Sequence, residues 1–293
     1  MDQTVTPSDW DALSDSELDT WERKIASRYM GSLPWEIVVW GIGNTLIWLS
    51  LWPLVLMDVL PLWLAFPIAV INVSAAYLPS HDCQHSIIAS RGRPLRWLNE
   101  FVGWFSLIPL AFPFRYMRET HMQHHAHAND PELDPDIDTK AASGWDFARK
   151  TIMGLQPAAQ AEQTQYYEAL QRTGKVHLMG EAIAFQSVFL VVLFACALSG
   201  YAIEAALLWW LPKHIALTYI RFYLSWMPHH PAQDTGRYRD TRGFRSRLGN
   251  LGSSGMQYHI IHHLYPRIPL CKTPAAYRAL LPILERKGCE LGW

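Results

Sequence analysis

The chain alternates between long apolar runs and strongly polar stretches. Apolar residues dominate positions 35–57, 59–78, 182–198 and 202–226. A helix of about 20 such residues spans the ~30 Å hydrocarbon core of a bilayer. Asp58 separates the first two runs and Ser199-Gly200 separates the last two, and breaks this short are typical of antiparallel helix pairs. The pattern therefore predicts an all-α membrane protein with four transmembrane helices arranged as two hairpins.

The amino-terminal stretch 1–34 is polar and predicts an amphipathic lead-in. Ser14 and Glu17 fit a capping box that opens a helix running to about Tyr29. Trp21, Ile25 and Tyr29 would share one face of that helix. This face would either lie on the membrane surface or pack against the rest of the protein.

Composition limits the class of protein and its partners. Half of the 293 residues are hydrophobic, and the net charge of −1 argues against a nucleic acid partner. The early residues are acidic and lack an apolar core, so no cleavable signal peptide is expected. The cysteines form no CxxC pair, which favours free thiols. They are Cys83, Cys196, Cys271 and Cys289.

Histidine provides the most informative pattern. Eight of the 13 histidines lie in three short runs, one HxxxH and two HxxHH: His81 and His85; His121, His124 and His125; His259, His262 and His263. On a helix, residues three and four apart share a face, so each run would direct two or three imidazoles at one point. A single HxxxH is as often a pair of unrelated histidines, but three such runs indicate a metal site. Eight imidazoles exceed what one ion needs, so we expect two ions.

The histidine runs also determine the expected topology. The first two runs must lie on one side of the membrane to meet, so the apolar stretch 97–114 between them cannot cross once. We expect it to be re-entrant or interfacial, which is tolerated where irregular backbone is buried in protein. All three runs and both termini then share one side. Basic residues gather on this side, including Arg115, Arg118, Arg149 and Lys150, so it is expected to be cytoplasmic.

Additional polar residues occur in and after the last apolar run. His229 and His230 follow it directly, and we expect His229, rather than His230, to be a ninth ligand. Lys213, His214 and Arg221 lie within the run, where a charge costs about 2.5–3.5 kcal/mol. They would either join neighbouring helices or line a substrate tunnel beneath the metals.

The histidine pattern, spread around two pairs of spans, resembles the integral-membrane fatty acid desaturase and hydroxylase superfamily over nearly the whole chain. The segments HMQHHAHANDP (121–131), DPD (134–136) and YHIIHHLYPRIP (258–269) are most similar to the desaturase-like β-carotene hydroxylases. The resemblance implies one membrane domain over 1–293. Its parts would be the lead-in (1–34), two span pairs (35–79 and 181–227), an interfacial segment with cytoplasmic cap (80–180), and the rest of the cap (228–293).

The resemblance also implies a site. A non-haem di-iron centre would be held by the eight histidines of the three runs together with His229, and O2 would be its co-substrate. Asp82, Asp134 and Asp136 would be catalytic positioning carboxylates that orient these histidines, although Asp before Pro is also common turn chemistry. His127 lies just beyond the second run and is not expected to be a ligand.

The implied activity is O2-dependent oxidation of an unactivated C–H bond in a lipophilic substrate, most similar to carotenoid ring hydroxylation. Acyl-lipid desaturation shares the first hydrogen abstraction and remains an alternative. A membrane metal transporter or metal-binding protein is an alternative of another class. No flavin or haem motif is visible, so a separate electron donor such as ferredoxin is expected. Arg237, Arg239, Arg242, Arg245 and Arg247 would dock that donor or face anionic lipid headgroups.

Overall fold

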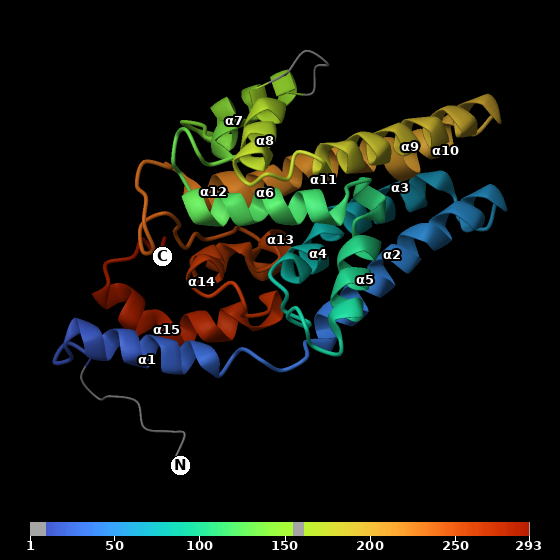
Figure 1. Ribbon diagram of the computed structural model, residues 1–293. Helices are drawn as coiled ribbons and strands as arrows, with labels where there is room; N and C mark the ends of the chain where they lie inside the picture. Colours follow the sequence, from blue (N-terminus) through green and yellow to red (C-terminus); the bar gives the residue numbers. More distant parts are fainter. Residues whose placement is uncertain (1–9, 155–160, 293) are drawn as a thin grey trace.

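The protein is a bundle of long helices with a layer of shorter helices gathered at one end (Figure 1). The computed structural model describes residues 10–154 and 161–292, and every regular element in these two ranges is helical. The long helices run side by side and end together at two tight turns. The opposite end forms a cap in which the carboxy terminus lies. This confirms the all-α class expected from the sequence.

Three helices in the described ranges are long and apolar enough to cross a membrane. They are α2 (Trp35–Leu56), α3 (Leu62–Ala75) continued by α4 (Tyr77–Gln84), and α9 (Leu178–Leu198). Asp58 adopts a positive φ of 57° in the tight turn between the first two. The hairpin expected at 35–78 is therefore present, and its second helix continues into the first histidine run.

The fourth expected span, 202–226, is helical throughout but irregular. Helical residues continue to His229, in the order α10 (Ala202–Ala205), a π-helical segment (Ala206–Trp210), α11 (Leu211–Ile220), a second π-helical segment (Arg221–Trp226) and α12 (Met227–His229). Each π-helical segment comes just before a proline, Pro212 or Pro228. A proline lacks an N–H and its ring clashes with the preceding helical turn, and the wider turn relieves that clash. A membrane crossing by this helix stays a prediction.

Tryptophans join the two helix pairs. The Trp48 indole N–H of α2 donates to the Leu208 carbonyl at 2.9 Å, and the ring of Trp48 lies 5.4 Å from that of Trp209. Trp209 in turn donates to the Pro109 carbonyl at 2.8 Å. Buried indoles usually find such partners, so the many tryptophans of the apolar runs hold the bundle together.

The polar residues of the last helix take part in packing. The Lys213 ammonium donates to Gln186 Oε1 of α9 at 3.0 Å and lies 4.1 Å from the centre of the Phe189 ring. His214 bonds the Trp210 carbonyl one turn earlier in its own helix. These contacts support the expectation that Lys213 joins neighbouring helices.

The ambiguous stretch 97–114 does not form a span. It contains α5 (Arg96–Ser106), a 3₁₀ turn (Ile108–Leu110) and the start of α6 (Phe114–His127). Eleven α-helical residues measure roughly 16 Å, too short to cross a bilayer. Gly103 lets α5 fold back on the chain, because a Cβ there would collide with the Phe114 ring.

The cap is built from short helices, and a second hydrophobic core joins those at the two ends of the chain, α1 (Asp15–Ser27), α14 (His259–Leu264) and α15 (Thr273–Arg286). Besides these and α6 and α12 it contains α7 (Gly144–Gly154), α8 (Ala161–Arg172) and α13 (Gly249–Ser253). The predicted capping box of α1 is present, with Glu17 N–H bonded to Ser14 Oγ. The sequence also predicts a helix at 158–171, and it appears as α8; positions 158–160 lie outside the described residues. Helix α7 was not predicted.

Helix α1 packs against the cap, which was one of its two expected positions. Leu18 and Ile25 are fully buried against α14 and α15. Glu22 on the same helix is also buried, and its carboxylate accepts hydrogen bonds from Arg237 at 3.0 Å and from the Tyr238 hydroxyl at 2.9 Å. Two of the five arginines expected to form a free basic surface are in fact paired: Arg237 with Glu22, and Arg242 with Glu290 at 2.9 Å.

Candidate metal centre

The three histidine runs meet in the cap. The first run lies at the end of α4, the second on α6 and the third on α14, while His229 ends α12. Their imidazoles form two groups. Within each group, the ligand atoms all lie within 4.8 Å of one another. The first group contains His81, His85, His121 and His262, and the second contains His124, His229, His259 and His263. These groups bring together His229 and seven of the eight expected histidines.

His125 completes the first group and lies beside the second. Its Nε2 is 3.1 Å from His121 Nε2 and 2.9 Å from His262 Nε2. Its ring stacks on His263 with centroids 4.2 Å apart. The first group therefore has five imidazoles and the second has four.

Helix geometry explains this division. A residue four positions along an α-helix is rotated by about 40° from the first, whereas one three positions along is rotated by about 60° the other way. The pairs separated by four residues fall in one group: 81 with 85, 121 with 125, and 259 with 263. The histidine three residues after the first of its run, His124 or His262, belongs to the other group. Each HxxHH run thus contributes to both groups.

The donor set fits two metal ions. Ring nitrogens face one another across short gaps, such as 2.9 Å between His85 Nε2 and His121 Nε2. Others are buried without any hydrogen-bond partner, including both ring nitrogens of His81 and of His259. Unpaired buried nitrogens are costly, and ions bound at two such points would satisfy them. Ligand nitrogens about 2.1 Å from an ion lie within roughly 4.2 Å of one another, and the 4.8 Å limit on each group is close to this value.

Burial keeps most of these imidazoles in the form that binds metal. It lowers the pKa of six of them well below the ordinary value, and the neighbouring imidazoles add to this effect; they are His85, His121, His125, His259, His262 and His263. Neutral imidazole is the metal-binding form, so these side chains are ready to coordinate at neutral pH.

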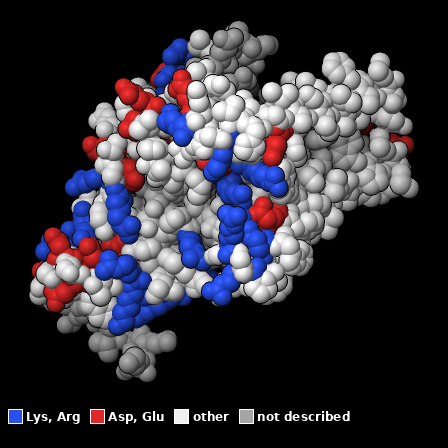
Figure 2. Space-filling model, viewed as in Figure 1, with Lys and Arg blue, Asp and Glu red and all other residues white. Residues whose placement is uncertain are grey.

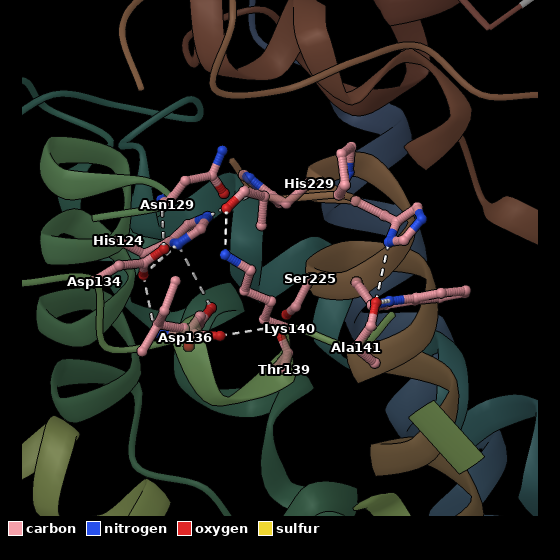
Figure 3. A pocket seen from close by; sticks show the side chains of 14 residues that line it. His124, Asn129, Asp134, Asp136, Thr139, Lys140, Ala141, Ser225 and His229 are labelled. Atoms are coloured by element: carbon pink, nitrogen blue, oxygen red, sulfur yellow. Dashed lines mark hydrogen bonds and ion pairs between the residues drawn. The ribbon is translucent and has the colours of Figure 1, made fainter. Parts of the chain in front are cut away.

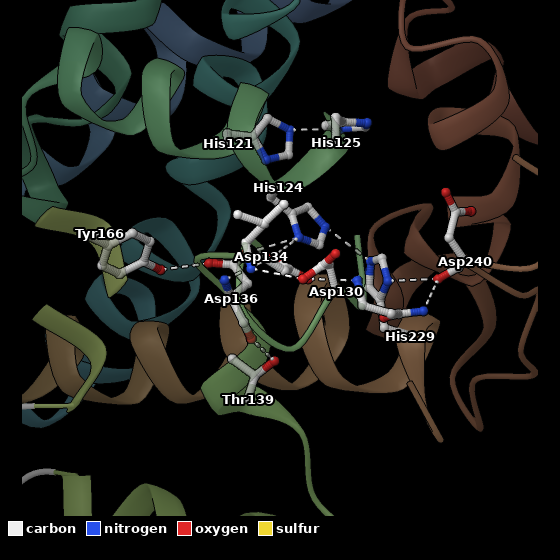
Figure 4. A network of polar contacts seen from close by, with 12 residues as sticks. His121, His124, His125, Asp130, Asp134, Asp136, Thr139, Tyr166, His229 and Asp240 are labelled. Atoms are coloured by element: carbon white, nitrogen blue, oxygen red, sulfur yellow. Dashed lines mark hydrogen bonds and ion pairs between the residues drawn. The ribbon is translucent and has the colours of Figure 1, made fainter. Parts of the chain in front are cut away.

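His124 is oriented by a carboxylate. Its Nδ1–H donates to Asp134 Oδ1 at 2.8 Å, which leaves Nε2 free to face the second group (Figure 4). Asp134 is itself held by the backbone N–H groups of Asn129, at 2.8 Å, and Asp136, at 2.9 Å. Burial alone would lower the pKa of His124, but Asp134, with the nearby carboxylates of Asp136 and Asp240, raises it to about 9.

The other two predicted carboxylates are placed differently. Asp136 Oδ2 lies 3.9 Å from His124 Nδ1, and Oδ1 accepts a 2.7 Å hydrogen bond from Tyr166. Asp82 lies 3.8 Å from His81 Nδ1, too far for a hydrogen bond, and instead accepts the Leu270 N–H at 3.0 Å. Asp82 thus joins α4 to the segment after α14, whereas direct support of a histidine belongs to Asp134.

Backbone contacts distinguish the two histidines of the last helix. His229 Nδ1–H donates to the Asp240 carbonyl at 2.9 Å, and its Nε2 lies 3.2 Å from His124 Nε2. His230 bonds the Ala141 carbonyl and lies outside both groups. The preference for His229 over His230 agrees with this geometry, and His127 also lies outside both groups.

A small cavity adjoins the second group. It has room for about one water molecule and is lined by His124, Asp134, Asp136, Lys140 and His229, among others (Figure 3). The cavity is too small for a long apolar molecule, so the substrate must reach the centre from elsewhere.

Comparison with known proteins identifies the class that this fold and site define. The model of the fatty acid desaturase family matches residues 57–292, and the chain belongs to that family. This confirms the resemblance noted from the histidine runs. It also favours an enzyme over a metal transporter.

Individual relatives include enzymes acting on two kinds of lipid. The chain is 26% identical to fatty acid conjugase FAC2 A of Calendula officinalis over 71% of its length, and 24% identical to an sn-1 oleoyl-lipid 12-desaturase of Anabaena variabilis over 78%. It is 25% identical to a zeaxanthin 4-ketolase of Chlamydomonas reinhardtii over 70%. The matched regions cover 64%, 59% and 43% of these relatives, so the chain spans less than two thirds of each.

Proposed function

We propose that the protein is an O2-dependent di-iron oxidoreductase that hydroxylates the ring of a carotenoid. The observation that carries the metal assignment is the pair of adjacent, buried histidine groups with five and four imidazoles. Imidazole-rich sites suit iron among several transition metals, and family membership favours iron. When bound, two irons would supply the O2 activation needed to remove hydrogen from an unactivated carbon.

The chain's own residues would hold and orient this centre. Asp134 fixes the tautomer of His124, and the Asp240 carbonyl does the same for His229, so that both Nε2 atoms point into the second group. Such supporting contacts typically change metal affinity or activity 10–100-fold. Burial of the histidines in the cap keeps bulk water away from the reacting carbon.

The position of the site relative to the bundle supports a lipophilic substrate. The first histidine run lies at the end of a candidate membrane span, so a substrate dissolved in the bilayer could reach the centre without entering water. We infer that the cap and both termini face the cytoplasm, because of the arginines and lysines of the cap.

A carotenoid ring is favoured by the motifs around the second and third histidine runs, and the zeaxanthin 4-ketolase among the relatives agrees with it. The conjugase and the 12-desaturase favour an acyl lipid, and this is the second candidate. Both reactions begin with abstraction of one hydrogen. They differ in whether oxygen then recombines with the carbon or a second hydrogen is removed.

The test is expression in cells that accumulate β-carotene, with pigments and fatty acids analysed from the same culture. Hydroxylated carotenoid with an unchanged fatty acid profile is the expected result. New double bonds in the fatty acids with unchanged pigments would select the second candidate. Elemental analysis of the extracted protein should give about two irons per chain, and zinc or a single metal after growth in iron-rich medium would contradict the di-iron assignment.

A further inference from the structure

Five arginines gather on one face of the cap, close to the first histidine group. We call them the arginine patch: Arg91, Arg93, Arg96, Arg118 and Arg267. They come from three parts of the chain that lie together, because Arg267 reaches Ser90 Oγ at 3.0 Å and Arg96 and Arg118 both bond Glu100. Figure 2 shows a band of Lys and Arg side chains across the middle of the face in view, over α4, α5 and the start of α6.

The patch carries a large excess of positive charge. Arg96 and Arg118 share the single carboxylate of Glu100. Arg91, Arg93 and Arg267 are exposed, and no carboxylate in the described ranges forms an ion pair with them. In the segment 237–247, Arg237 and Arg242 are paired within the chain, whereas Arg239, Arg245 and Arg247 are exposed and have no ion pair within the described ranges. With one carboxylate for five arginines, the arginine patch carries the larger excess of positive charge and is the better surface for an acidic partner.

The patch also lies near the metal centre along the chain. Ser86, which bonds Arg96 at 2.8 Å, directly follows His85. His85 in turn contacts His121 at 2.9 Å between Nε2 atoms. Arg118 comes one helical turn before His121, and Arg267 comes four residues after His263. A molecule seated on the patch would be separated from the first group by little more than the His85–Ser86 segment.

The proposed reaction requires such a molecule. Hydroxylating one C–H bond with O2 gives an alcohol and water, and it consumes two protons and two electrons beyond those that the substrate supplies. No flavin or haem motif is visible in the chain to deliver them. We propose that the arginine patch is the docking surface for a small, acidic one-electron carrier protein. This inference rests on the proposed function.

The two exposed edges of helix α5 favour docking of a carrier protein on the arginine patch over binding of lipid headgroups. Trp97 and Phe101 form one exposed edge, with 65% and 45% of their surface accessible. Arg96 and Glu100 form the neighbouring edge, since residues four apart share a face. Tryptophan and phenylalanine suit the membrane interface, so the apolar edge would lie there and the charged edge would face water. An acidic protein, rather than lipid headgroups, is thereby favoured.

The test compares two double charge reversals in neutral phosphatidylcholine nanodiscs, with an acidic [2Fe–2S] ferredoxin as the probe. Arg91→Glu/Arg93→Glu removes the exposed part of the patch. Arg245→Glu/Arg247→Glu is the matched control, because these arginines are also exposed and are likewise separated by one residue. Reversal in the patch should raise the KM for ferredoxin about tenfold at low salt, and much less at high salt. The kcat at saturating ferredoxin and the iron content should not change, and the control should stay within about twofold of wild type.

A reductant that needs no docking distinguishes a failure of the docking proposal from a failure of the proposed function on which it rests. Single-turnover oxidation driven by dithionite should be the same in wild type and both variants. If the wild type fails with dithionite as well, the proposed function is wrong. If the wild type turns over but the patch variant keeps its ferredoxin KM, the docking proposal is overturned. It is also overturned if that variant changes only its binding to phosphatidylglycerol vesicles. Arg91→Gln/Arg93→Gln provides a milder version in case the reversal lowers the yield of folded protein.

Discussion

The Glu22 carboxylate accepts a 2.7 Å hydrogen bond from the hydroxyl of Tyr265, a residue 243 positions later in the chain. Tyr265 follows the third histidine run by two residues, and its backbone N–H bonds the Ile261 carbonyl within that run. The amino-terminal helix is therefore joined to the segment that carries three of the histidines. Glu22 lies outside the part matched by the family model, which begins at residue 57.

Replacing Glu22 by Ala should destabilise the cap. The change would leave Arg237 and two tyrosine hydroxyls without their acceptor, and losing a buried charged partner costs about 2–4 kcal/mol. Chemical unfolding followed by tryptophan fluorescence measures the effect. Arg23→Ala changes an exposed neighbour on the same helix and should shift stability by less than about 0.5 kcal/mol. Equal unfolding curves for the two variants would show that the Glu22 contacts contribute nothing.

Asp134→Asn should reduce turnover about 10–100-fold, because a neutral amide supports His124 less well than a carboxylate does. Turnover per bound iron and the rate of iron loss to a chelator would both report the change. Asp82→Asn is the matched comparison: its amide oxygen can still accept the Leu270 N–H, so activity should fall much less. A larger loss of turnover in Asp82→Asn than in Asp134→Asn would mean that Asp82, rather than Asp134, supports the histidines.

His124→Ala should abolish turnover and lower the iron content, since it removes a nitrogen from the second group. The protein should remain in the membrane, because spans insert by their hydrophobicity. His127→Ala, on the same helix but outside both groups, should retain most activity. Membrane fractionation with iron analysis tests both variants. A His124→Ala enzyme that keeps wild-type activity would remove this residue from the ligand set.

The Lys213 and Gln186 side chains should be energetically coupled. Gln186→Leu would leave the buried Lys213 ammonium without its hydrogen-bond acceptor, which should destabilise the bundle by about 1–3 kcal/mol. Adding Lys213→Met removes the unpaired charge and should recover much of that loss. Thermal unfolding in detergent, analysed as a double-mutant cycle, gives the coupling. Additive effects would mean that the contact does not join α9 and α11.

Local patterns in the sequence predicted the elements that depend on neighbouring residues. The capping box at Ser14 and Glu17, the hairpin at Asp58 and the helical histidine runs each follow from a few adjacent positions. The choice of His229 over His230 also agrees with the structure, since it required only that one imidazole at the end of the helix face the other runs. The division of each HxxHH run between two groups follows from the same helical rotation, and it becomes visible once both groups are located.

Contacts between distant parts of the chain could not be predicted in this way. Glu22 is one acidic residue among several in its helix, and no local pattern shows that Arg237 will pair with it. For the same reason Arg237 and Arg242 looked free although both are paired, and the arginine patch is assembled from three separate segments. The role of Asp82 in holding Leu270, 188 positions away, is equally invisible before folding.

The division of the histidine runs has a consequence for assembly. Because α6 and α14 each donate to both groups, an ion held by one group fixes the helices that carry the ligands of the other. Binding at the two positions is then thermodynamically coupled, and the first ion prepares the place of the second. Iron titration of the apoprotein should therefore proceed cooperatively, with the half-loaded form remaining a minor species throughout.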